Sequence, residues 1–148
     1  MLDKVMIRII EENTAGMVAT IASDGSPAVS PKGTFVVADP SRIAFGNIRS
    51  PGTISNLHRD PRVQICFLDV LARKAVRIVG VAKILPKAAT PQDVVDCFEN
   101  LWPEYLPSIK EFVIILVNSA ELILSPAYDL GHSEEQLRSA YRKRIVQT

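Results

Sequence analysis

Apolar positions along this chain follow two periods, one typical of helices and one typical of strands. Within residues 2–10, apolar side chains recur at helical spacing, which predicts a short amphipathic helix. Residues 62–70 and 75–85 instead alternate between apolar and polar side chains, as half-buried strands do. Strand patterns along the whole chain predict six strands, at residues 17–22, 28–37, 42–46, 62–70, 75–85 and 111–124.

Turn and cap signals separate these predicted elements. Asp24-Gly25 predicts a tight hairpin between the first two strands, and residues 38–41 predict a second turn. Three further helices are predicted at residues 50–59, 90–101 and 134–146. Because closing a sheet removes its exposed edges, strands joined by such tight turns favour a barrel. The predicted fold class is therefore mainly β, a six-stranded antiparallel barrel with peripheral helices.

Size and charge limit the possible functions. The chain has 148 residues, of which 47% are hydrophobic, as expected for one domain with a substantial core. Its 17 basic and 16 acidic side chains nearly balance, so we expect neither nucleic acid nor a membrane as the main partner. The charged N-terminal residues do not resemble a targeting segment, which predicts a cytoplasmic protein. We assign residues 1–124 to the barrel and 125–148 to a polar tail with a solvated basic helix.

Residues 44–57 combine the end of a strand, a turn and the start of a helix. Ser50 precedes Pro51, a pattern typical of an N-cap followed by proline at the first helical position. The N–H groups at a helix N-terminus attract anions. Arg49 and the hydroxyls of Ser50 and Thr53 would add a charge and further hydrogen-bonding groups. This combination predicts a site for a phosphate monoester; the alternative is a capped helix with a solvated arginine.

A second unusual segment interrupts the predicted strand 28–37. Proline and glycine at residues 31 and 33 indicate a bulge, an edge or a close approach of a ligand to the backbone. Lys32 lies between them. If this segment adjoins residues 44–57, one end of the shared surface carries Lys32 and Arg49. That arrangement suits a planar heteroaromatic ring with a phosphate tail.

The order of these segments resembles the pyridoxamine-phosphate-oxidase-like family of FMN-binding split barrels. The resemblance lies in GMVATIASDGSPAVSPKGTF (residues 16–35), RIAFGNIRSPGTISNLHRDPRVQICF (residues 42–67) and AVRIVGVAKI (residues 75–84). With the flanking helices and the last long strand, it extends over residues 1–124. The chain is shorter than the pyridoxamine phosphate oxidases and lacks their C-terminal substrate segment. Oxidation of the vitamin substrate is therefore not expected.

The resemblance implies a homodimer with FMN bound between the subunits. The residues that it places around FMN fall into four groups. They are Ser30, Pro31 and Lys32 at the isoalloxazine or its polar edge; Phe45, Gly46 and Asn47 along the ring; Arg49, Ser50 and Thr53 at the phosphate; and Asn56 as a brace for this shell.

Four functions remain open at this point. The first is an FMN-dependent oxidoreductase that exchanges electrons with an unknown small-molecule donor or acceptor, with the flavin performing the electron chemistry. The second is a non-enzymatic flavin carrier or store. A third is a barrel of the same fold that binds deazaflavin or haem, and a fourth is an interaction module without a ligand. The sequence does not identify a catalytic residue, and no metal is expected.

One strand has apolar side chains on both faces. Residues 112–117 lack the polar alternation of a half-exposed antiparallel strand. We therefore expect a helix or a second subunit to cover the outer face.

Overall fold

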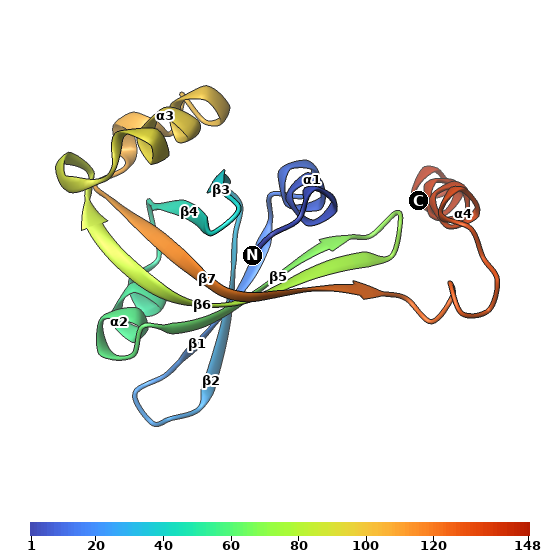
Figure 1. Cartoon of the computed structure of the whole chain (residues 1–148), viewed down its shortest axis with the longest axis horizontal. Coiled ribbons are helices and arrows are strands. Elements are labelled where there is room, and N and C mark those ends of the chain that lie inside the picture. The colour runs from blue at the N-terminus through green and yellow to red at the C-terminus, as the bar shows by residue number, and fades with distance from the viewer.

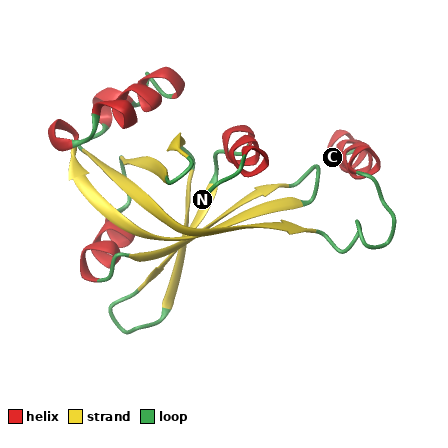
Figure 2. Ribbon diagram, viewed as in Figure 1, coloured by secondary structure: helices red, strands yellow, loops and turns green.

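The computed structural model describes residues 1–148 as one curved antiparallel sheet with helices at its periphery (Figures 1 and 2). The strands are β1 (Gly16–Ile21), β2 (Pro27–Lys32), β3 (Phe35–Asp39), β4 (Arg42–Asn47), β5 (Arg62–Asp69), β6 (Lys74–Pro86) and β7 (Glu111–Leu124). The helices are α1 (Lys4–Glu12), α2 (Pro51–Arg59), α3 (Gln92–Leu101) and α4 (Glu134–Val146), with short 3₁₀ turns at Lys87–Ala89 and Leu106–Ser108.

The predicted fold class is confirmed, but the sheet has seven strands rather than six. The predicted strand 28–37 is two strands, because the chain leaves β2 after Lys32 and enters β3 at Phe35. β2 pairs only with β1, whereas β3 pairs only with β4. Pro31 is therefore on an edge strand, where a missing N–H is tolerated. The proline and glycine in this segment mark the point where the chain changes partner.

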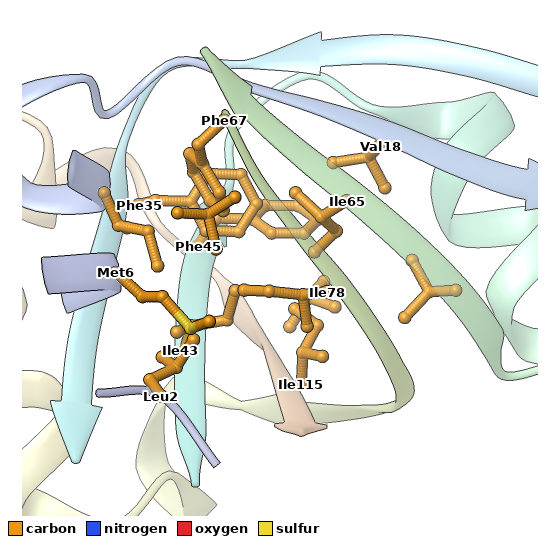
Figure 3. Packing of buried hydrophobic residues seen from close by; sticks show 14 of the residues in the cluster. Leu2, Met6, Val18, Phe35, Ile43, Phe45, Ile65, Phe67, Ile78 and Ile115 are labelled. Atoms are coloured by element: carbon orange, nitrogen blue, oxygen red, sulfur yellow. The ribbon is translucent and has the colours of Figure 1, made fainter. Parts of the chain in front are cut away.

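The strand order is β2-β1-β5-β6-β7-β4-β3. The two edge strands, β2 and β3, therefore follow each other in the sequence but lie at opposite edges of the sheet. Side-chain packing brings edge strand β3 close to β5, on the other side of the sheet. The ring of Phe35 on β3 lies edge-on to Phe67 on β5 and to Phe45 on β4, with centroids 4.9 and 5.2 Å apart. Figure 3 shows the three rings gathered within the main core. The structure is thus a barrel that is split along one side.

Helix α1 covers one end of this core. Its apolar stripe, which the sequence predicts, buries Met6, Ile9 and Ile10. Leu2 precedes the helix and lies beside Met6 in the same cluster (Figure 3). Burying four such side chains contributes roughly 1.5–3 kcal/mol each, so α1 is an integral part of the barrel.

Helix α3 explains why β7 is apolar on both faces. Val113 and Ile115 point into the main core, whereas Phe112 and Ile114 belong to a second cluster with α3. The Phe112 ring lies edge-on to Phe98 of α3, with centroids 5.2 Å apart. A helix therefore provides the predicted cover for this part of β7.

The start of α3 is one residue later than predicted, since the sequence indicates Thr90 as the N-cap and Pro91 as the first helical residue. The helix begins at Gln92 with Pro91 in the N-cap position, so Thr90 does not cap it. The Thr90 hydroxyl instead donates a hydrogen bond to the carbonyl oxygen of Pro86 at 2.9 Å.

A bulge between β6 and β7 lets the sheet bend at its centre. Val79 pairs with Ser119, but Gly80 pairs with Val117, which leaves Asn118 as the extra residue. A Cβ atom on Gly80 would lie 2.5 Å from the carbonyl oxygen of Leu116, so only glycine fits this close approach. A glycine inside the strand pattern 75–85, and Asn118-Ser119 inside the pattern 111–124, predict a bulge or bend at these positions, and the register confirms it.

The C-terminal segment packs back onto the tip of the β5–β6 hairpin. Helix α4 begins with a capping box formed by Ser133 and Gln136. The Arg138 guanidinium lies 2.7 Å from the carboxylate of the buried Asp69, and Leu137 is buried beside it. The interpretation of this helix as fully solvated is therefore wrong for the face that carries Arg138.

Candidate anion-binding pocket

A polar pocket of about 300 Å³ lies between β2 and the N-terminal end of α2. It brings together side chains from residues 28–37 and 44–57, the two segments with unusual sequence patterns. Six of the ten predicted cofactor-contacting residues line it: Ser30, Lys32, Arg49, Ser50, Thr53 and Asn56.

The first turn of α2 presents backbone donors to this pocket. Pro51 has no N–H, and the first intrahelical bond is from the amide of Ile54 to the carbonyl oxygen of Ser50, at 2.9 Å. The amides of Gly52 and Thr53 have no partner within the chain. A helix N-terminus with two such amides favours a bound anion.

Ser50 occupies the N-cap position, as predicted, but its hydroxyl makes no capping hydrogen bond. Its backbone angles, φ −144° and ψ 50°, lie outside the extended region that N-cap residues usually adopt. The hydroxyl of this residue is therefore available to a ligand rather than committed to the helix.

Two cationic side chains complete the donor set. Lys32 Nζ donates a hydrogen bond to Ser30 Oγ at 2.7 Å, and burial lowers the pKa of Lys32. Arg49 is exposed and forms no ion pair within the chain. No carboxylate lines the pocket, so nothing there opposes a bound dianion. An anion placed here would stabilise the charged form of Lys32 and offset its desolvation.

Asn56 links α2 to the barrel. Its side-chain amide donates to the hydroxyl of Thr20 on β1 at 3.0 Å, and its carbonyl oxygen accepts a hydrogen bond from Arg59 at 2.9 Å. Arg59 also reaches the carbonyl oxygen of Ile21, at 3.3 Å. These bonds fix the helix whose N-terminus forms the pocket.

Sequence reasoning missed Thr20 and Arg59. Thr20 is buried although it is polar, and its place in an otherwise apolar strand was the available signal.

The four remaining predicted residues lie elsewhere. Phe45 is 1% exposed within the aromatic core, so its side chain cannot line a bound ring. Gly46 packs against Ile109, and the Asn47 side chain donates to Glu111 Oε1 at 2.7 Å. Pro31 is exposed on β2 but does not line the pocket.

The chemistry of the pocket fits a phosphate monoester. Ammonium, guanidinium, amide and hydroxyl groups are all hydrogen-bond donors to phosphate oxygens, and charge-assisted bonds of this kind are the stronger ones. A Cβ atom on Gly52 would meet nothing within 4 Å, so a ligand can approach the backbone there. The volume lies at the lower end for ligand sites, which suits a phosphate and its tail better than a whole dinucleotide.

Comparison with protein families gives one match that spans most of the chain. A sequence model described as "Pyridoxamine 5'-phosphate oxidase" matches residues 2–124. No curated protein matches the chain. In addition, no helix of the structure is long and apolar enough to cross a membrane.

Solved structures share the fold. HupZ of Group A Streptococcus superposes with a TM-score of 0.72 at 22% identity, covering 84% of this chain and 96% of HupZ. A protein of Mesorhizobium loti described as FAD-binding gives a TM-score of 0.65 at 19% identity, with 82% and 94% covered. A structure named F420 reductase gives 0.61 at 17% identity, with 81% and 98% covered. At these identities the likeness establishes the split-barrel fold.

Proposed function

The chain belongs to the pyridoxamine 5'-phosphate oxidase family, and we propose that it binds FMN as an FMN-dependent oxidoreductase acting on a small substrate. One observation carries this proposal. Lys32, Arg49 and the free amides of Gly52 and Thr53 converge on one pocket that contains no carboxylate. The several oxygens and the double charge of a phosphate ester match this number of donors and the two cations.

Each group in the pocket has a distinct role in the proposal. Arg49 and Lys32 neutralise the phosphate charge, and the amides of Gly52 and Thr53 fix its position. Ser30 orients the Lys32 ammonium through their 2.7 Å hydrogen bond. When bound, FMN supplies the electron transfer, while the protein binds, orients and shields it.

A second copy of the chain would complete the site in this proposal. The pocket is too small to enclose a ring system, so the isoalloxazine would extend to the surface beside β1 and β2. Apolar side chains are exposed on the outer face of the sheet, including Met17 (50%) and Leu116 (46%). Homodimer interfaces are rich in such side chains. We therefore propose a homodimer with FMN between its subunits.

The pocket selects a phosphate and does not distinguish between the ring systems attached to it. FAD and a deazaflavin both carry phosphate, and structural neighbours of this chain are described as FAD-binding and as F420 reductase. These cofactors are the alternatives to FMN. A flavin carrier without a substrate is the alternative to an enzyme.

An absorbance spectrum of the purified protein tests the cofactor. After incubation with FMN and desalting, flavin bands should co-elute with the protein. FAD or F420 in the same assay should be retained less, because their phosphates are diesters and the pocket fits a monoester. The Arg49→Ala variant should bind FMN about 10-fold or more weakly, since a hydrogen bond to a charged group contributes roughly 1.5–3 kcal/mol. Arg8→Ala removes the same charge from the exposed face of α1 and should have no effect. Equal FMN retention by Arg49→Ala would refute the phosphate site.

Two further measurements test the homodimer and the oxidoreductase activity separately. Sedimentation at micromolar concentration should show a dimer, and a monomer would exclude an FMN site between subunits. Steady-state oxidation of a reduced nicotinamide should distinguish an oxidoreductase from a carrier, because only turnover consumes donor beyond one equivalent per flavin.

A further inference from the structure

A second cavity, of about 620 Å³, lies at the tip of the β5–β6 hairpin, where the end of β7 and helix α4 meet it. Figure 1 shows this tip and helix α2 on opposite sides of the molecule along its long axis, and the N-terminal end of α2 lines the phosphate pocket. The two cavities share no lining residue. Part of the wall comes from residues 125–144, beyond the end of the family match at residue 124. The cavity is thus separate from the proposed flavin site.

The interior of the cavity is apolar and accessible. Its floor is formed by aliphatic side chains of β5, β6, β7 and the turn between β5 and β6. Leu68, Val70 and Leu124 are 53%, 41% and 48% exposed, and Ile123 is 36% exposed. Adjacent large apolar side chains left open to solvent are uncommon unless something binds there.

The rim of the cavity is basic. Arg73, Lys74 and Arg144 line it, and no acidic residue does. Lys74 is already paired with Glu134 of α4, at 2.5 Å. Arg73 and Arg144 form no ion pair within the chain. Two guanidinium groups without partners are therefore placed above an apolar floor.

The backbone at Arg73 adds an independent observation. Arg73 is the one non-glycine residue of the chain with positive φ, at 51°. Residues held in this left-handed region are strained, and such strain concentrates at functional sites. A glycine would serve the turn better, yet an arginine stands here at the cavity rim.

The C-terminal segment holds the cavity wall in place. The Tyr128 hydroxyl donates to the carbonyl oxygen of Ala72 at 2.6 Å, and the Ser125 amide donates to that of Arg73 at 3.0 Å. Arg138 pairs with the buried Asp69 at 2.7 Å. These contacts fix α4, which carries Arg144 and Tyr141, against the hairpin. The site is therefore formed before any ligand arrives, which lowers the entropic cost of binding.

We propose that this cavity binds a small amphipathic carboxylate, with its aliphatic or aromatic body on the apolar floor and its carboxylate at Arg73 and Arg144. Guanidinium groups match the planar, two-oxygen geometry of a carboxylate. The aliphatic floor takes up the body of the ligand through the hydrophobic effect.

Fluorescence titration with 8-anilinonaphthalene-1-sulfonate, an amphipathic anion, tests this proposal on the full chain. The probe should bind at one saturable site, and decanoate should displace it whereas decanol at equal concentration should not. Arg144→Gln and Arg73→Gly should each weaken probe binding about tenfold, since each removes one charge-assisted contact. Arg73→Gly should fold well, because glycine accepts the positive φ without strain.

Two controls make the result decisive. Arg142→Gln removes the same charge from α4 but does not line the cavity, so it should leave probe affinity unchanged. Excess FMN should not displace the probe, and Arg49→Ala should not affect it. Probe binding that survives the double variant Arg73→Gly/Arg144→Gln, or that is lost on adding FMN, would overturn the proposal. Displacement by decanol as readily as by decanoate would overturn it too.

Discussion

The two halves of residues 44–57 have different roles, although the sequence presents them as one continuous strand–turn–helix segment. The first half, Phe45 to Asn47, is packed inside the molecule between the aromatic core and the α3 cluster. The second half, Arg49 to Asn56, surrounds an open polar pocket. The surroundings of the two glycines differ accordingly. A Cβ atom on Gly46 would lie 2.3 Å from Ile109 Cδ1, whereas one on Gly52 would meet nothing within 4 Å.

This contrast shows that a glycine, at the end of strand β4 or at the start of helix α2, can be required for two unrelated reasons. At Gly46 the neighbouring atoms belong to the protein, so the requirement is for packing. At Gly52 the space is open, and a need for glycine there would come from a ligand. Substitutions that separate stability from cofactor binding therefore test the assignment of each half.

The largest expected effect is on folding. Gly46→Val should reduce the free energy of unfolding by about 3 kcal/mol, because overpacking a filled core forces side chains and backbone to shift. Urea denaturation followed by circular dichroism would measure it. The folded fraction should still bind FMN with unchanged affinity. A large loss of affinity at unchanged stability would instead place Gly46 at the ligand.

The next effect is on binding. Lys32→Ala should weaken FMN binding by about 2 kcal/mol, or roughly 30-fold, because one charged donor to the phosphate is lost. The free energy of unfolding should change little, since the ammonium makes a single hydrogen bond, to the half-buried Ser30 hydroxyl of the same strand. Isothermal titration calorimetry would measure the affinity. The matched control is Lys83→Ala on an exposed position of β6, for which we expect no change in binding.

Much of the fold was predictable because its signals are local. The alternation of residues 62–70 and 75–85 identified the central hairpin, and Gly80 and Asn118 marked the bulge that bends it. The split of residues 28–37 was not predicted, because periodicity within a segment does not show which neighbour it pairs with. Pro31 and Gly33 were recognised as an interruption, but their meaning depended on the strand order of the whole sheet.

The site was predictable to the same limited extent. The pattern Ser50-Pro51 identified a helix start, and Arg49 and Lys32 were charges without an evident structural role, so the pocket could be assembled from them. Phe45 and Gly46 could not be separated from the pocket-lining residues on sequence grounds, because no local signal distinguishes a residue that faces the core from one that faces a ligand. The cavity at the hairpin tip left no pattern in the sequence, since β6 and α4 meet there only in the folded chain.

A smaller effect should come from Gly52. Gly52→Ala should raise the free energy of unfolding by about 0.5–1 kcal/mol, because alanine loses less conformational freedom in a helix and its Cβ meets no atom. FMN affinity should fall severalfold, since the new methyl group lies where the phosphate approaches the amide. Thermal denaturation with and without FMN would show both changes. A variant that is more stable and binds FMN equally well would contradict a close approach at this amide.

The smallest effect concerns pH. Burial lowers the pKa of Lys32 below its ordinary value of 10.5, so the folded protein loses this proton before the unfolded chain does. As pH rises from the folded-state pKa toward 10.5, the folded protein no longer carries the cost of a desolvated ammonium. The free energy of unfolding therefore rises over this pH window. FMN affinity should fall over the same window, because the phosphate loses its cationic partner. Stability and affinity should therefore move in opposite directions. The Lys32→Arg variant keeps its positive charge at these pH values. Its FMN affinity, measured by fluorescence quenching, should therefore stay constant over the window in which the affinity of the wild type declines.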